Sequence, residues 1–221
     1  MRLRWIRVFT CGKRGKRSYT LRAGRARTLR GLYATLAAVA LVCVPCAMAC
    51  SLAAAAPRAS TAPGGCPGAT LQPTTADEAA VNSATLCLVN AVRSAHHLHA
   101  LRSNGQLAKV ATSQVSSMIR WDYFADVRPS GQTPMSLVDV TRYPAHTAGF
   151  AVGQNIAWGT GTFASPEHIV TEWMASPPHR AIILTGSYRD AGVAVDPALP
   201  GVLRAGHSGA TYAMEFGVRH F

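Results

Sequence analysis

The stretch 153–184 constrains the fold of this chain more than any other part of the sequence. An apolar run and a turn with two glycines precede Ser165, which is a favourable N-cap for a helix. Pro166 suits the first helical position, and Glu167 lies in the first turn, where a negative charge complements the helix dipole. Pro177 and the proline after it predict the end of this helix. The stretch therefore predicts an extended segment that leads into a capped helix.

Helices come first in the sequence and strands come last. Thr75, with a glutamate three residues later, matches the capping-box pattern of a helix start. Asn104 followed by Gly105 predicts a second start, and apolar residues recur at helical spacing after both. The predicted order is helices at 75–95, 105–120 and 135–143, a strand or extended segment at 150–158, helical segments at 166–176 and 179–184, and strands at 191–195 and 212–218. This order favours an α+β fold built in layers.

The basic charge of the chain is concentrated at its N-terminus. The formal net charge is +12, a value that at first suggests a nucleic-acid partner. Half of the 22 Lys and Arg residues lie in residues 1–50, where there is no Asp or Glu. The rest of the chain is nearly neutral, and it has no basic stripe with interleaved aromatic residues. We therefore expect no nucleic-acid partner.

The basic region leads into a largely apolar segment at 32–56, which is interrupted by Thr35, Pro45 and Ser51. A basic region, an apolar region and then small residues are the order found in export signals. Residues 1–56 are predicted to be a leader with a signal peptide or a retained signal anchor, since about 20 apolar residues span a bilayer. The residues before Cys50 also resemble a lipoprotein signal, so cleavage, lipidation and retention all remain open. We expect a domain that is secreted or at the cell surface, with membrane contact only through the N-terminal segment.

The segment 57–74 is rich in Pro, Gly, Ser and Thr, and it predicts a flexible linker before a domain at 75–221. Two cysteines remain after the leader, Cys66 and Cys87. Exported domains with two cysteines usually pair them, so we expect a disulfide that ties the N-terminal segment to the first helix. Two unpaired apolar cysteines are the alternative.

Several short motifs occur in the order and spacing of one protein family. They are Leu88-Val89-Asn90-x-x-Arg93, Leu107-x-x-x-Ala111, Tyr123-Phe124, Gly153-Gln154-Asn155-Ile156-Ala157-Trp158-Gly159, Trp173-Met174-x-Ser176-Pro177-x-His179-Arg180, and Gly192-Val193 with the run 212–217. With these motifs the chain resembles the CAP superfamily (cysteine-rich secretory proteins, antigen 5, pathogenesis-related class 1) in its short bacterial secreted form. The resemblance implies an α-β-α sandwich with a small, largely antiparallel sheet.

The resemblance also implies a central cleft. In much of the family two histidines and two glutamates line that cleft and can bind a divalent metal. Here Asp126 stands at the place of one histidine, Gln154 at that of a glutamate, and Ser176 at that of a second glutamate, which short bacterial members commonly lack. Only His179 remains of the four. The resemblance thus implies a cleft of Asp126, Gln154, Asn155, Ser176 and His179, and we expect no metal or other cofactor there.

Three conspicuous side chains have structural interpretations. Asn155 lies inside an apolar run, so its amide needs hydrogen bonds, for which backbone groups between sheet and helix are the predicted partners. The indole N–H of Trp173 needs an acceptor. Arg180 is predicted to tie a loop through a carboxylate or carbonyl groups, with a surface ion pair as the alternative.

The altered cleft favours a protein that acts by binding. The predicted ligand is extracellular, and it is a small apolar molecule, a cell-wall component or a protein. The alternative is a residual hydrolase of peptide or cell wall, in which Asp126 and His179 form a general-base pair beside a serine nucleophile. The sequence contains no nucleophile-elbow motif and places no oxyanion hole, so binding is the first prediction.

Overall fold

The computed structural model describes residues 65–221. The predicted leader with its apolar segment at 32–56, and the first part of the predicted linker, lie outside the described residues. Between residues 65 and 221, no helix has the length and apolar character needed to cross a membrane.

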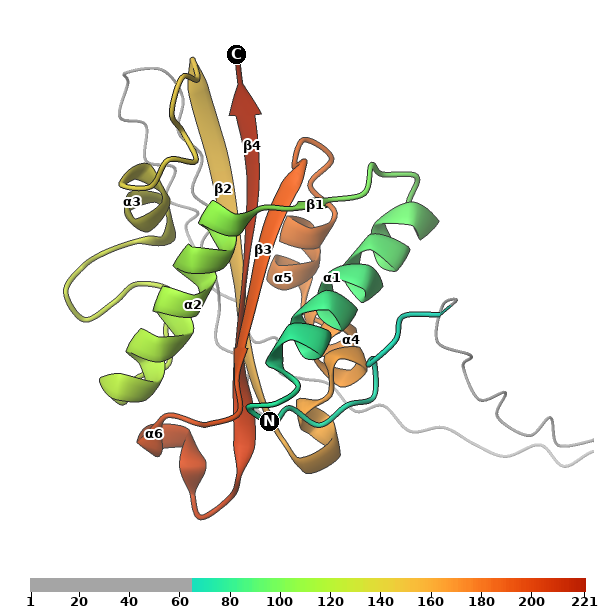
Figure 1. Ribbon diagram of the computed structural model, residues 1–221, viewed down its shortest axis with the longest axis vertical. Helices are drawn as coiled ribbons and strands as arrows, with labels where there is room; N and C mark the ends of the chain where they lie inside the picture. Colours follow the sequence, from blue (N-terminus) through green and yellow to red (C-terminus); the bar gives the residue numbers. More distant parts are fainter. Residues whose placement is uncertain (1–64) are drawn as a thin grey trace, which may run out of the picture. The chain divides into compact units, whose positions relative to one another are not determined.

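A four-stranded sheet forms the middle layer of the domain (Figure 1). Its strands are β1 (Arg102–Ser103), β2 (Gly149–Thr160), β3 (Asp190–Asp196) and β4 (Gly209–His220), in the order β1-β3-β4-β2. β4 pairs antiparallel with both β2 and β3, whereas the short β1 pairs parallel with β3. The sheet is therefore largely antiparallel, as predicted.

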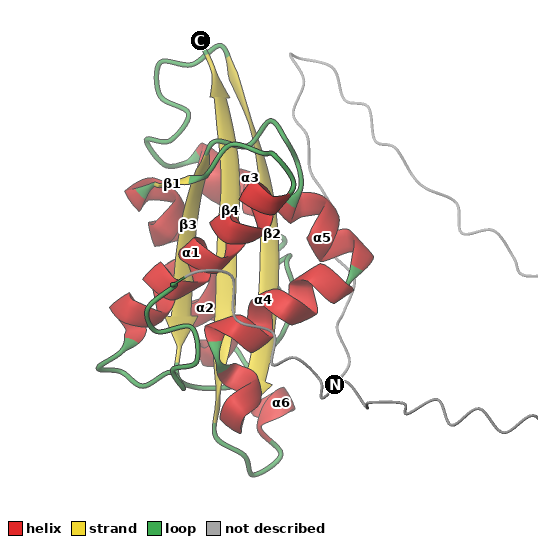
Figure 2. Ribbon diagram, turned by 90° about the vertical axis from the view of Figure 1, so that its right-hand side faces the viewer, coloured by secondary structure: helices red, strands yellow, loops and turns green. Residues whose placement is uncertain are grey.

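Helices cover both sides of the sheet, which confirms the predicted α-β-α sandwich (Figures 1 and 2). One side carries α2 (Gly105–Arg120) and α3 (Pro134–Asp139). The other side carries α1 (Glu78–Ala95), α4 (Pro166–Ala175) and α5 (Pro177–Ile183). The 3-10 turn η1 (Gly161–Ala164) joins β2 to α4, and the short α6 (Gly201–Arg204) lies in the β3–β4 connection.

The alternation of side chains along the strands assigns each residue to one face. Tyr212 and Phe216 of β4 pack in the large core with α1, α4 and α5. Ala213, between them in the sequence, packs with α2. Gly192 of β3 lets α2 lie closely on the sheet, because a Cβ atom there would overlap the backbone of Leu107 and Ala108.

Two of the predicted helix starts are confirmed. The side chain of Asn104 accepts hydrogen bonds from the backbone N–H groups of Gln106 and Leu107, at 2.9 and 3.2 Å. The Ser165 hydroxyl accepts from the N–H of His168 at 3.4 Å. Both caps are local interactions, which explains why a short sequence pattern was enough to predict them.

Two other helix boundaries differ from the prediction. The capping box at Thr75 is wrong: α1 begins at Glu78 with Asp77 as N-cap, and no side chain caps it. The predicted helix at 135–143 ends early, at Asp139. Its last predicted residue, Tyr143, is buried instead, and its hydroxyl donates to the carboxylate of Asp190 at 3.0 Å.

The segment before α1 is held to the domain through residues 65–74. Cys66 and Cys87 form the expected disulfide, with Cα atoms 5.7 Å apart. The carbonyl of Ala69, a buried residue, accepts from the N–H of Glu167 at 2.9 Å. These contacts differ from the flexible linker that the Pro/Gly composition predicts, because the disulfide and a backbone bond to α4 fix this part of the segment.

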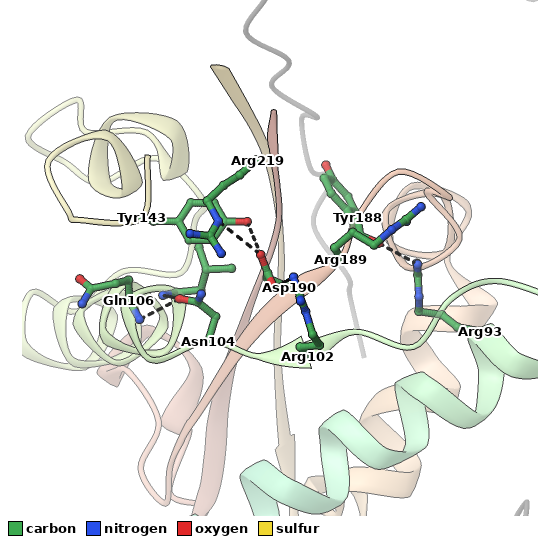
Figure 3. Close-up of polar contacts among 10 residues, drawn as sticks. Arg93, Arg102, Asn104, Gln106, Tyr143, Tyr188, Arg189, Asp190 and Arg219 are labelled. Atoms are coloured by element: carbon green, nitrogen blue, oxygen red, sulfur yellow. Dashed lines mark hydrogen bonds and ion pairs between the residues drawn. The ribbon is translucent and has the colours of Figure 1, made fainter. Parts of the chain in front are cut away.

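A buried carboxylate joins the strands at the end where β1 meets β3 (Figure 3). Asp190 is 4% exposed and accepts hydrogen bonds from Tyr143 and from Arg102, the latter at 3.1 Å. Arg219 of β4 lies 3.7 Å from the same carboxylate and covers the ring of Tyr143. The cluster ties the loop after α3 to strands β1, β3 and β4. Because its polar groups contact one another, its role is structural.

Candidate functional site

The predicted cleft residues Gln154 and Asn155 are neighbours on β2, so their side chains point to opposite faces of the sheet. Gln154 donates from Nε2 to the carboxyl group of Glu215 on β4. Asn155 donates from Nδ2 to the backbone carbonyl of His179 on α5, at 3.2 Å. Gln154 therefore belongs to the α2/α3 face and Asn155 to the α4/α5 face, where its amide makes the predicted sheet-to-helix bond.

A group of acidic and amide side chains, here called the carboxyl cluster, lies on the α2/α3 face and consists of Asp126, Gln154 and Glu215. Glu215 is fully buried, and burial raises its pKa to about 8, with the nearby Asp126 adding to the rise. The Gln154 bond and the charge of Arg128 lower that pKa by less. Burial raises the pKa of Asp126 to about 7. Both groups therefore hold their protons to unusually high pH.

The loop that carries Asp126 is fixed by α2. The buried side chain of Gln114 donates from Nε2 to the carbonyls of Ala125 and Asp126, at 2.8 and 3.3 Å. Arg128 donates back to the Gln114 amide oxygen at 3.1 Å. Even so, Oδ1 of Asp126, Oε1 of Gln154 and Oε2 of Glu215 are buried without a hydrogen-bond partner. The positions of the carboxyl groups are fixed, but their hydrogen bonding is incomplete.

His179 and Ser176 form a separate pair in the first turn of α5. Nδ1 of His179 lies 2.7 Å from the Ser176 hydroxyl, and its Nε2 is buried without a partner. Burial lowers the pKa of His179 to about 4, so the imidazole is neutral near pH 7. The pair orients the start of α5, whose backbone Asn155 also contacts.

The predicted cleft residues are thus divided between two groups. In residues 65–221 neither a hydrogen bond nor an ion pair joins His179 to Asp126 or Glu215. A search of the same residues finds no group of three His, Cys, Asp or Glu side chains that could hold a metal ion. The donor set therefore does not fit the divalent metal of the wider family, and the catalytic pair of Asp126 and His179 is not brought together.

Two polar residues of the first helical motif have structural roles. Asn90 accepts from the N–H of Leu101 at 2.7 Å and donates to its carbonyl at 3.0 Å. The fully buried guanidinium of Arg93 donates to the carbonyls of His99, Ile183 and Thr185. It also donates to the carbonyl of Tyr188 (Figure 3).

Arg180, which the sequence pointed to as a loop tie, is exposed. The loop tie is made by Arg93 instead, because a buried guanidinium reaches several carbonyl groups at once.

An apolar pocket of about 360 Å³ lies on the α4 side, where β2 meets η1. It is lined by Trp158, Gly159, Thr160, Phe163, His168 and Glu172. Phe163 is 55% exposed, although large apolar side chains are usually buried in this domain. Its ring meets that of His168 edge to face, with centroids 4.7 Å apart. We call this hollow the aromatic pocket.

Gly159 fixes one wall of the aromatic pocket. A Cβ atom at this position would overlap the backbone carbonyl of Phe163, so η1 can fold tightly against β2 only because residue 159 is glycine. The tight turn leaves the Phe163 side chain over the hollow. None of the pocket's residues was predicted as a site from the sequence, although Trp158 and Gly159 end the Gly153–Gly159 motif.

A second hollow, of about 330 Å³, lies between α1 and α2. Its lining includes Asn82, Asn90, Cys87 and Val193. It has no aromatic side chain and no charged one.

Comparison with known proteins identifies the family. The family model for the cysteine-rich secretory protein family, CAP, matches residues 86–198, slightly more than half of the chain. The chain belongs to this family, as the motifs predicted. A search of curated proteins finds no match.

Three solved structures are similar to this chain. An extracellular protein with an SCP domain from Bacillus anthracis is 22% identical with a TM-score of 0.50, over 66% of this chain and 44% of that protein. An outer surface protein from Borrelia burgdorferi is 17% identical with a TM-score of 0.48, over 61% and 89% of the two chains. A cysteine-rich secretory protein from Staphylococcus aureus is 17% identical with a TM-score of 0.44, over 65% and 40%. This chain thus corresponds to less than half of the Bacillus protein, and the likeness to it shows the fold.

Proposed function

We propose that this chain is an exported CAP-domain protein that acts by binding a small apolar ligand, and that the aromatic pocket is the binding site. The observation that carries the proposal is the exposed Phe163 ring beside a preformed hollow of about 360 Å³. Ligand sites are usually concave, apolar and aromatic, with a few polar groups at fixed positions. Here Glu172 and His168 are the polar groups.

The separation of the His179–Ser176 pair from the carboxyl cluster also favours binding over catalysis. A general base works best when its pKa lies near the working pH, whereas burial lowers the pKa of His179 to about 4. Glu215 is fully buried, so a substrate cannot reach its carboxyl group. The cleft that would carry family chemistry is therefore a poor catalytic site.

Export is proposed from the N-terminal sequence and from the matched proteins. The basic region and the apolar segment at 32–56 have the order of an export signal. The matched proteins from Bacillus anthracis and Borrelia burgdorferi are described as extracellular and outer-surface proteins. A disulfide, here Cys66–Cys87, is typical of oxidising compartments. Cell fractionation with an antibody to the domain tests this; a cytosolic product would contradict it.

A fluorescent apolar probe tests the binding site. N-phenyl-1-naphthylamine is uncharged at pH 7, and we expect it to bind the full chain with a rise in emission. Phe163→Ala should weaken this binding by about tenfold, because it removes one aromatic wall. Val140→Ala is the matched control, since Val140 is 82% exposed and lies outside the pocket. Equal affinity for both variants would contradict the proposed site.

One observation favours the alternative hydrolase. The Ser176 hydroxyl lies 2.7 Å from His179, which is the spacing of a nucleophile and its base. Turnover of peptide or cell-wall substrates by the full chain, abolished in His179→Ala and Ser176→Ala at unchanged melting temperature, would support it. If only the melting temperature falls, the pair is structural.

A further inference from the structure

The aromatic pocket has a charge as well as apolar walls. Glu172 lines it from α4, and its Oε1 lies 3.8 Å from Nε2 of His168. The side chains of the two residues are only 27% and 28% exposed, so water screens the carboxylate incompletely. The segment 149–176, which supplies all the lining residues, contains two glutamates and no lysine or arginine.

The position of Glu172 on its helix adds to the negative potential. α4 ends at Ala175, so Glu172 lies in the last turn, where the helix dipole places its negative end. A basic side chain commonly offsets that end, but the last turn of α4 has none. A cation in the pocket would therefore be attracted by both the carboxylate and the helix end.

The aromatic walls favour the same kind of ligand. Phe163 and His168 line the pocket from the α4 side, and the face of a Phe ring attracts cations through its quadrupole. Nε2 of His168 is buried without a hydrogen-bond partner, and the Glu172 carboxylate is 3.8 Å from it. An aromatic ring beside a carboxylate offers an organic ammonium group both a cation–π contact and a counter-charge.

We propose that the aromatic pocket binds a small organic ammonium cation, whose charge lies against Glu172 and whose alkyl groups contact Phe163. This inference rests on the proposed function, because it names the ligand class of the same pocket. A neutral apolar ligand would fill the hollow equally well but would gain nothing from the charge of Glu172.

A pair of molecules of the same shape tests the charge. Choline carries a quaternary ammonium group, and 3,3-dimethylbutan-1-ol is its uncharged carbon analogue. In calorimetric titrations of the full chain we expect choline to bind about tenfold more tightly than the alcohol. Glu172→Gln should lower choline affinity to that of the alcohol and leave alcohol affinity unchanged. Glu167→Gln is the matched control, since Glu167 is on the same helix but does not line the pocket.

The outcomes separate this inference from the proposed function. Equal affinities for choline and the alcohol, no choline binding, or no effect of Glu172→Gln would each overturn the ammonium site. The proposed function would then still stand if Phe163→Ala weakens the binding of N-phenyl-1-naphthylamine. If Phe163→Ala leaves that binding unchanged, the proposed function fails.

Discussion

The two faces of the sheet hold their buried polar groups in different ways. On the face of α1, α4 and α5, buried donors reach backbone carbonyls: Arg93 bonds four of them, Asn155 bonds that of His179, and Trp173 bonds that of Ile156. On the face of α2 and α3, Gln114 also donates to two carbonyls, but Glu215 has one bonded oxygen and one without a partner. The first arrangement fixes loops, and the second keeps carboxyl groups protonated.

The difference shows which part of the family scaffold is retained. Side chains that donate to backbone carbonyls stabilise the fold independently of the ligand, because backbone acceptors are present in any sequence. The carboxyl cluster contains two carboxyl groups and one amide, and burial raises the pKa of both carboxyl groups. The following changes test this contrast between the two faces.

Arg93→Met should have the largest effect. The substitution keeps the apolar stem but leaves four carbonyl groups without their donor, so we expect the free energy of unfolding to fall by about 4 kcal/mol. Urea unfolding of the full chain measures it. Arg180→Ala is the control, because Arg180 is exposed; its expected change is below about 0.5 kcal/mol. Equal effects would mean that Arg93 does not hold the loops.

Glu215→Gln should change the pH dependence of stability on the other face. The folded pKa of Glu215 is about 8, above its ordinary value of 4.5, so its contribution is complete below pH 4.5 and is lost as pH rises to 8. Between pH 5 and 8 the free energy of unfolding of the variant should rise by about 3 kcal/mol relative to that of wild type. Asp139→Asn, at an exposed position, should leave the slope unchanged. A variant with the wild-type slope would show that Glu215 ionises normally.

His179→Gln should act in the opposite direction. The folded pKa of His179 is about 4, below its ordinary 6.5, so its contribution is present above pH 6.5 and is lost as pH falls towards 4. This loss is about 3 kcal/mol in wild type and should be absent in the variant. Thermal unfolding from pH 7 to pH 4 measures it. If both proteins lose stability equally over this range, the imidazole is not buried as described.

Much of the fold follows from local sequence patterns. Asn104 and Ser165 signal their helices because an N-cap acts within three residues. Strand β1 was missed because it has two residues, and only its pairing with β3 defines it. The end of α3 was misplaced because Tyr143 turns inward to Asp190, a contact 47 residues away in sequence.

The site was harder to predict from sequence. The resemblance placed Gln154 and Asn155 in one cleft, although the period of two in a strand directs neighbours to opposite faces. Glu215 carried a signal that was not used, since it is a lone acid inside the apolar run 212–218. No local sequence pattern predicted the aromatic pocket, because the pocket depends on how closely η1 packs against β2 at Gly159.

Locating a bound probe is the most direct test of the account. Amide chemical shifts of the full chain, recorded with and without N-phenyl-1-naphthylamine, should move most at Trp158, Thr160, Phe163, His168 and Glu172. Residues of the carboxyl cluster, Asp126, Gln154 and Glu215, should move little. Shifts centred on that cluster, or on the hollow between α1 and α2, would contradict the claim that the aromatic pocket is the binding site.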